Sequence, residues 1–104
     1  KEDLIEENVV KPLREFKEIC DEEELECHVV VFPLLEWEEE YAWQDIEEQV
    51  NGILDEVGLE HTSLLDMYME HDAGSLHVGE NDILHLNKKG HELAGEYISY
   101  YLTT

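Results

Sequence analysis

An aspartate and a histidine three residues apart, Asp82 and His85, are the side chains of this sequence best suited to acid–base chemistry. At this spacing the two side chains lie on the same side of a turn or of a helical turn. The carboxylate can then hold one imidazole nitrogen as a donor, which leaves the other nitrogen free to accept a proton. Pairs of this kind also occur as plain surface contacts, so a catalytic role depends on the elements that position them.

Asn87 follows the pair and is a good N-cap for a helix that the apolar spacing predicts over residues 88–101. The cap and the helix would brace the loop that carries Asp82 and His85. Loops held by a rigid scaffold are frequent sites of binding and catalysis. The local sequence therefore favours a functional loop at residues 82–87.

Composition limits the classes of partner. The chain has 104 residues, enough for one small domain or part of a larger one, and its net charge is −22 with histidine neutral. Acidic runs at 21–24 and 36–40 argue against nucleic acid or an anionic membrane as a partner. Solvated surface is the simplest interpretation of these runs; adaptation to high salt, and binding of divalent cations or a basic partner, are the alternatives. No apolar run approaches the length of a membrane span, and no cofactor is predicted.

The two cysteines, Cys20 and Cys27, are seven residues apart and lack the spacing of a zinc site. We predict reduced, packed thiols, one at a helix end and one on a buried strand. Reduced thiols favour a cytoplasmic location. Because the chain begins at Lys1 rather than at a methionine, we expect a piece of a longer polypeptide, and secretion stays an alternative.

Hydrophobic periodicity predicts a helix followed by a strand in the first third of the chain. Residues 4–20 have helical spacing, and Pro12 implies either a kinked helix or one that starts near Pro12 and ends near Glu23. The β-branched run 27–32 predicts a strand that is buried on both faces and ended by Pro33.

A second helix and a second strand are expected in the middle of the chain. The helix should span about residues 42–57, with Gly58 as its C-cap. The strand should span about residues 60–65, and Asp66 should cap the turn at 67–70.

The order helix–strand–helix–strand–helix is typical of an α/β fold with right-handed crossovers and a parallel sheet. Two strands leave crossover helices without sheet to cover and an unpaired strand edge exposed. We therefore expect residues 1–104 to be a single portion of a larger α/β domain, completed by another segment or by self-association through the open sheet edge. Trp37 and Trp43 should cover the sheet edge or pack on the next helix, with a place in a substrate cleft as the alternative.

This order of elements, ending in the block 82–91, resembles the C-terminal half of the SGNH (GDSL-type) hydrolase family. The segment 29–33, Val-Val-Val-Phe-Pro, is similar to a late central strand of that family, and the stretch 49–59, which contains Asn51, is similar to its next helix. Residues 63–67 look like its last strand with an aspartate. In the final block the Asp, His, Asn and Gly-His all fall at the family spacing, before a closing helix.

The resemblance implies a three-layer αβα fold of the flavodoxin-like SGNH type and a serine ester hydrolase. His85 would be the general base and Asp82 its orienting partner in a Ser-His-Asp triad acting on a small-molecule ester. The family's Gly-Asp-Ser nucleophile segment and its oxyanion-hole residues have no counterpart in this chain, and Ser75 lacks the setting of a nucleophile. We therefore expect the chain alone to be inactive, with the N-terminal half of the same hydrolase domain as its partner.

Two other hypotheses remain. A non-catalytic acidic domain could keep the fold and serve in binding or assembly. Carboxylates and imidazoles also suit a metal site, for which the candidates are His71, Asp72, His77, His85 and His91. Their spacing matches no finger or helical histidine pair, so no metal is predicted. His28 and His61 are expected to be strand residues without a role.

Overall fold

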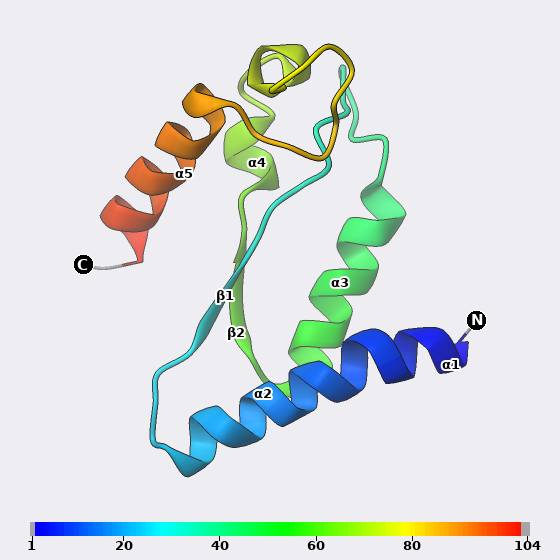
Figure 1. Cartoon of the computed structure of the whole chain (residues 1–104), viewed down its shortest axis with the longest axis vertical. Helices are drawn as coiled ribbons and strands as arrows, with labels where there is room; N and C mark the ends of the chain where they lie inside the picture. Colours follow the sequence, from blue (N-terminus) through cyan, green and yellow to red (C-terminus); the bar gives the residue numbers. More distant parts are fainter. Residues whose placement is uncertain (1, 103–104) are drawn as a thin grey trace. The chain divides into compact units, whose positions relative to one another are not determined.

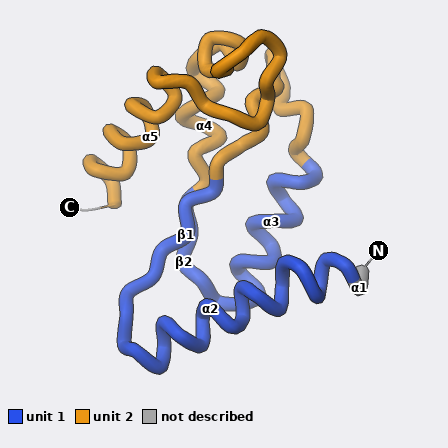
Figure 2. The backbone as a smooth tube through the Cα atoms, viewed as in Figure 1, with its two compact units in different colours: residues 1–31, 45–62 blue, residues 32–44, 63–104 orange. Residues whose placement is uncertain are grey.

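The structure is a computed structural model that describes residues 2–102. It divides into two compact units (Figure 2), of which unit 1 comprises residues 1–31 and 45–62 and unit 2 comprises residues 32–44 and 63–104. The elements are labelled in Figure 1 and follow this order along the chain: α1 (Glu2–Ile5), η1 (Glu6–Val10), α2 (Lys11–Glu22), β1 (His28–Val31), α3 (Gln44–Val57), β2 (Glu60–Ser63), α4 (Leu65–Tyr68), η2 (Ala73–Leu76) and α5 (Lys88–Tyr101).

The N-terminal segments α1, η1 and α2 form one uninterrupted helical stretch from Glu2 to Glu22. The five residues of η1 end at Val10, two residues before Pro12, and form a π-helix in which the N–H of Lys11 donates to the carbonyl of Glu6. Proline lacks an N–H and its ring crowds the preceding turn, so a wider turn accommodates it. Of the two alternatives that Pro12 left open, the structure has the helix that continues through it, without a new start there.

Strands β1 and β2 form a two-stranded parallel sheet, with α3 as the crossover between them. The α/β class is thereby confirmed. The prediction that β1 is buried on both faces is wrong, because His28 is exposed and the three valines of the strand are only partly covered. Within residues 2–102 no third strand extends this sheet, so β1 lacks the second neighbour that buries a central strand.

The crossover helix α3 starts at Gln44, two residues after the predicted start, and ends at Val57 as predicted. Gly58 has φ 88°, a left-handed conformation that glycine adopts without a steric penalty. The N–H groups of Gly58 and Leu59 both lie 3.0 Å from the carbonyl of Leu54. The two hydrogen bonds to this one carbonyl close the helix end, and the predicted role of Gly58 as a C-cap is confirmed.

The prediction of reduced cysteines is wrong, because Cys20 and Cys27 form a disulfide with a Cα–Cα distance of 6.3 Å. Helix α2 ends at Glu22, and Glu24 then takes a left-handed φ of 53° that reverses the chain. The N–H of Leu25 bonds the carbonyl of Cys20 at 2.8 Å. This turn brings Cys27, which lies just before β1 and not within it, back beside the last turn of the helix.

In unit 2 the short helix α4 begins at Leu65, whereas the sequence predicted a turn at 67–70 capped by Asp66. Leu64 is the N-cap residue and makes no side-chain cap hydrogen bond, while Asp66 lies inside the first turn. The predicted capping role of Asp66 is therefore wrong, and the Ser63 hydroxyl instead accepts from the N–H of Leu65 at 3.2 Å. The buried apolar residues of this unit are Leu35, Trp37, Leu64, Leu65, Tyr68, Ala73, Leu76 and Ala94.

None of the helices in residues 2–102 combines the length and the apolarity that a membrane span requires.

Candidate functional site

The Asp82–His85 loop connects η2 to α5, and backbone hydrogen bonds hold it at several points. The carbonyl of Ile83 accepts from the N–H of Leu35 at 2.8 Å, and the carbonyl of His85 accepts from the N–H of Val78 at 3.2 Å. An isolated antiparallel bridge joins His77 to Leu86. Because the loop is tied to segments on both sides, its short polar stretch has a defined backbone.

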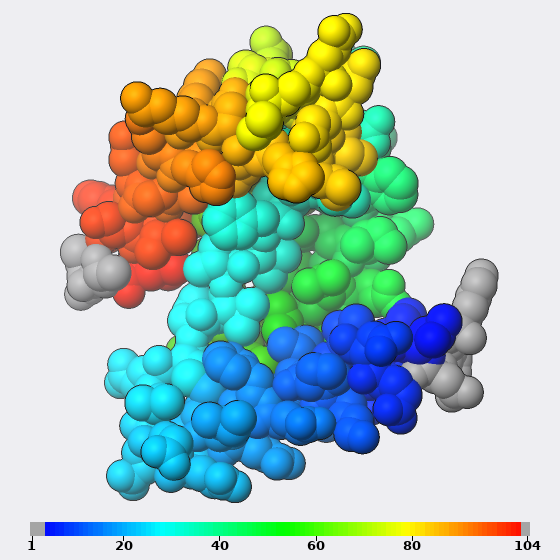
Figure 3. Space-filling view, in the orientation of Figure 1, coloured from blue at the N-terminus to red at the C-terminus, as the bar shows by residue number. Residues whose placement is uncertain are grey.

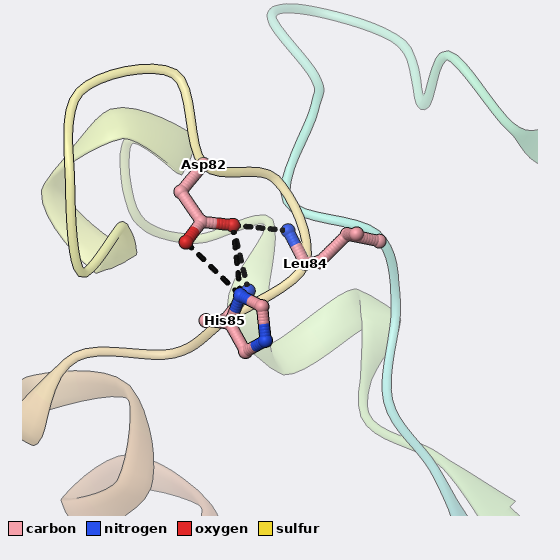
Figure 4. A network of polar contacts seen from close by, with 3 residues as sticks. All are labelled: Asp82, Leu84 and His85. Atoms are coloured by element: carbon pink, nitrogen blue, oxygen red, sulfur yellow. Dashed lines mark hydrogen bonds and ion pairs between the residues drawn. The ribbon is translucent and has the colours of Figure 1, made fainter.

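The carboxylate of Asp82 is the centre of the loop's polar contacts (Figure 4). Its Oδ1 accepts from the N–H of Leu84 at 3.1 Å and from the N–H of His85 at 3.2 Å. The Nδ1 of His85 lies 3.1 Å from Oδ1 and 3.0 Å from Oδ2 of the same carboxylate. The contact that the three-residue spacing predicts is thus present, whereas the catalytic role of the pair stays a prediction.

The electrostatics of Asp82 determine which nitrogen of His85 carries the proton. The backbone hydrogen bond from Leu84 is the largest cause that lowers the pKa of Asp82, and His85 adds a side-chain hydrogen bond, charge attraction and a backbone hydrogen bond. Asp82 is therefore a carboxylate at neutral pH and can only accept, so the hydrogen-bond network assigns the proton of a neutral ring to Nδ1. Nε2 is then the basic nitrogen, and in Figure 4 it points away from Asp82.

His85 is accessible, since its side chain is 71% exposed against 32% for Asp82. Within residues 2–102 we find no hydrogen-bond partner of Nε2. A neutral imidazole with one nitrogen held by a carboxylate and the other facing solvent can accept a proton from an approaching hydroxyl. This arrangement can serve as a general base.

The start of α5 braces the loop from its C-terminal side. Asn87 Oδ1 accepts from the N–H of Gly90 at 3.0 Å, which confirms the predicted N-cap. Its Nδ2 donates to the carbonyls of Ser75 at 2.8 Å and His77 at 3.2 Å. The buried Tyr68 hydroxyl donates to the carbonyl of Gly90 at 2.6 Å. The asparagine therefore links the helix end to the segment that precedes the loop.

His85 lies at the edge of a surface hollow of about 500 Å³ within unit 2. Its lining is almost entirely apolar and comprises Phe32, Pro33, Leu35, Val78, Leu84, Leu86 and the two histidines His85 and His91. Figure 3 shows the surface of the loop between residues 78 and 86 in yellow and orange. This hollow was not predicted from the sequence. The local signal was the apolar residues in an otherwise polar loop, of which Val78 and Leu84 are 62% and 68% exposed.

The two tryptophans have different surroundings. Trp37 is buried, and its Nε1 donates to the carbonyl of His71 at 2.9 Å. It also lines a second hollow of unit 2, of about 640 Å³, beside several glutamates. Trp43 is partly exposed and donates to Glu36 Oε1 at 2.9 Å. Neither contacts the Asp82–His85 pair through a hydrogen bond.

Two of the three serines of the chain, Ser75 and Ser63, have hydroxyls that are engaged with the backbone. Ser75 Oγ donates to the carbonyl of Asp72 at 2.6 Å, and Ser63 Oγ accepts from the N–H of Leu65. Neither forms a hydrogen bond with His85 within the described chain. The geometry therefore identifies no nucleophile for the pair among these two residues.

The histidines and the aspartate that were considered as metal ligands are not brought together in the described part of the chain. Among the described residues, no three or more His, Cys, Asp and Glu side chains gather as they would around a metal ion. His77 Nε2 instead contacts the carbonyl of Leu35 at 2.7 Å, and His85 contacts Asp82.

A second His–Asp pair, which sequence analysis overlooked, lies in unit 1. His61 Nε2 is 2.8 Å from Asp55 Oδ1, and the neighbouring His28 Nε2 is 2.7 Å from Thr62 Oγ1. Because Asp55 is on α3 and His61 is on β2, no spacing rule for a single element would have found the contact. Here the carboxylate holds Nε2, and the Asp55 side chain is 75% exposed.

Comparisons of the chain with models of protein families, with curated proteins and with solved structures find no match.

Proposed function

We propose that this chain supplies the histidine and aspartate of a Ser-His-Asp triad in an SGNH-type ester hydrolase with a three-layer αβα fold. The observation that carries the proposal is the Asp82–His85 geometry: the carboxylate holds Nδ1, and Nε2 is left exposed and unpaired among the described residues. The resemblance of the block from Asp82 to His91 to the final block of that family supports it from the sequence.

In the proposed reaction a serine outside these 104 residues attacks the acyl carbon of an ester. His85 Nε2 takes the hydroxyl proton as the C–O bond forms, and later returns it to the departing alcohol. Asp82 stabilises the imidazolium that exists between these two transfers, because its carboxylate faces Nδ1. Donors outside the chain would stabilise the oxyanion.

The surroundings of His85 suit an ester with an apolar group. Six of the eight residues that line the hollow beside it carry apolar side chains. Burial of an acyl or alkyl group against them would contribute about 25 cal/mol for each Å² removed from water. A charged or sugar-like leaving group would gain less from the same wall.

The proposed partner is the N-terminal half of the same hydrolase domain, which would complete the sheet and add the nucleophile. The observation behind it is the partly covered strand β1 followed by Phe32, which is 46% exposed. Self-association of this chain through the open sheet edge is the other proposed way to cover these residues. Sedimentation velocity distinguishes the two, because only self-association gives a dimer of the chain alone.

The test uses the full-length protein with an aryl ester and a fluorophosphonate probe for an activated serine. We expect His85→Ala to abolish both turnover and labelling, and Asp82→Asn to lower turnover by roughly 10⁴-fold, the size of the corresponding effect in serine proteases. His28→Ala is the matched control, since His28 is an exposed histidine of unit 1 that contacts Thr62. Normal turnover by His85→Ala would end the proposal.

The alternative function is a non-catalytic acidic domain for binding or assembly. The engaged hydroxyls of Ser63 and Ser75 favour it, because neither is available to His85 within the described chain. If the full-length protein contains no serine that reacts with the fluorophosphonate, this alternative replaces the hydrolase.

The cytoplasmic location expected from the sequence stays a prediction. The Cys20–Cys27 disulfide supports a different proposal, an oxidising compartment, because such bonds persist outside the reducing cytosol.

A further inference from the structure

A third hollow of unit 2, of about 440 Å³, lies between the region of α4 and the second half of α5. Its walls are made of aromatic rings and carboxylates. The residues that line it are Asp66, Met67, Glu70, His71, Leu93, Glu96, Tyr97, Tyr100 and Tyr101. No lysine or arginine is among these lining residues, so His71 is the basic side chain that lies beside the carboxylates in the described lining of the hollow.

The three tyrosines of the hollow form a cornered aromatic wall. The ring centroids of Tyr97 and Tyr101 are 4.6 Å apart, which follows from their i, i+4 spacing on α5. The rings of Tyr100 and Tyr101 are 4.7 Å apart and meet at 84°. Tyr100 is 69% exposed and Tyr101 is 61% exposed. The side chains of Tyr100 and Tyr101 are therefore largely exposed at the hollow, with their rings at nearly a right angle.

Aromatic faces and carboxylates attract the same class of ligand. A ring face carries negative electrostatic potential, and a cation within about 6 Å of the ring centroid is attracted to it. Asp66 and Glu70 from the α4 region, and Glu96 from α5, add full negative charges to the same hollow. Small hard cations such as Mg²⁺ keep their water shell and gain little from rings. A weakly hydrated organic cation gains from both kinds of wall.

We propose that this hollow binds the trimethylammonium group of a small organic cation, with choline as the simplest example. The ring corner of Tyr100 and Tyr101 would contact the methyl groups, and Asp66 and Glu70 would balance the charge. This site is independent of the Asp82–His85 pair, because none of its lining residues belongs to that loop. Its occupancy therefore does not rest on the proposed hydrolase activity.

The test is isothermal titration at about 0.15 M salt, where long-range attraction to the acidic surface is largely screened. Choline and tetramethylammonium are compared with 3,3-dimethylbutan-1-ol, the uncharged isostere of choline. We expect saturable binding of both cations, with the isostere at least about tenfold weaker, since it lacks the charge that the rings and carboxylates recognise.

Variants then separate the hollow from the overall charge. Tyr101→Leu should weaken choline about fivefold, and Tyr101→Phe should bind within about twofold of the unchanged chain, because it keeps the ring face. Glu70→Gln should weaken binding, whereas Glu92→Gln should not. Glu92 is the matched control, as it lies on α5, outside the hollow, near Lys88 Nζ at 3.9 Å. Circular dichroism checks that each variant is folded.

Three results would overturn the site: equal affinity for choline and its isostere, equal losses in Glu70→Gln and Glu92→Gln, or unchanged binding by Tyr101→Leu. Co-sedimentation with phosphatidylcholine vesicles tells whether the trimethylammonium group comes from a free cation or from a lipid headgroup. Protein that stays in the supernatant while binding choline recognises the free cation, and protein that sediments until choline is added recognises the lipid headgroup.

Discussion

Removal of the Cys20–Cys27 disulfide should lower the free energy of unfolding by about 2.5 kcal/mol. The bond joins residues at a sequence separation of 7, so it closes a loop of about eight residues. In the chain-entropy model such a cross-link removes about 8 cal/mol/K of entropy from the unfolded chain, which is about 2.5 kcal/mol at 25 °C. The perturbation is the double variant Cys20→Ala/Cys27→Ala.

The assay is urea unfolding followed by tryptophan fluorescence and by circular dichroism. With a slope of about 1–3 kcal/mol/M, the midpoint should fall by about 0.8–2.5 M. Cys20 is 3% exposed, so its replacement by alanine also removes packing. A second pair of titrations in a thiol-free reductant isolates that contribution, because neither protein then contains the cross-link.

The expected result is a large difference between the oxidised chain and the double variant, and a small one under reduction. An equally large difference in both conditions would assign the stability to packing of Cys20 and would refute the entropic argument. Alkylation of two thiols in the folded, unreduced protein would refute the disulfide itself.

Other substitutions and pH changes probe the two sides of the candidate loop. Tyr68→Phe removes the hydroxyl that donates to Gly90 at 2.6 Å and should cost about 1 kcal/mol in denaturant titrations. Burial raises the pKa of Tyr68 to about 12. The stability that the protonated hydroxyl contributes is therefore complete below the ordinary pKa of 10.0 and is lost as pH rises toward 12. Thermal unfolding at alkaline pH should show this loss in the unchanged chain and not in Tyr68→Phe. Gly90→Ala should lower the free energy of unfolding by about 1–3 kcal/mol, because the new Cβ would lie 2.6 Å from Leu86 Cδ2. Gly95→Ala on the same helix places its Cβ in open space and should raise the melting temperature, because alanine favours a helix over glycine. Backbone hydrogen bonds lower the pKa of Asp82, so its titration midpoint in carbon NMR should lie below 3.8. The contacts of the carboxylate with the loop should persist above the midpoint and be lost as pH falls through it. A midpoint at or above 3.8 would contradict these hydrogen bonds.

Features that depend on residues close together in the chain could be predicted from the sequence. The contact of Asp82 with His85 needs only a three-residue spacing and a turn. The cap of α5 by Asn87 and the closure of α3 at Gly58 likewise follow from local chemistry. In each case the interacting groups are fewer than about five residues apart, so few other arrangements compete.

Other features were decided by tertiary structure, and there the predictions failed or were absent. The disulfide depends on the left-handed turn at Glu24, a conformation that a glutamate rarely adopts and that its sequence does not announce. The exposure of β1 depends on how many strands join the sheet, which the strand's own residues do not encode.

The sequence by itself determined the local parts of this protein: its helix ends, its order of elements, and an aspartate that holds a histidine. Tertiary structure alone decided what surrounds them. The apolar wall beside His85 and the hollow between Asp66 and the tyrosines of α5 are both assembled from segments that are distant in the chain. The physical reason is the separation of the interacting residues along the chain. Local contacts are set by backbone geometry within a turn, whereas a hollow exists only after separate elements have packed.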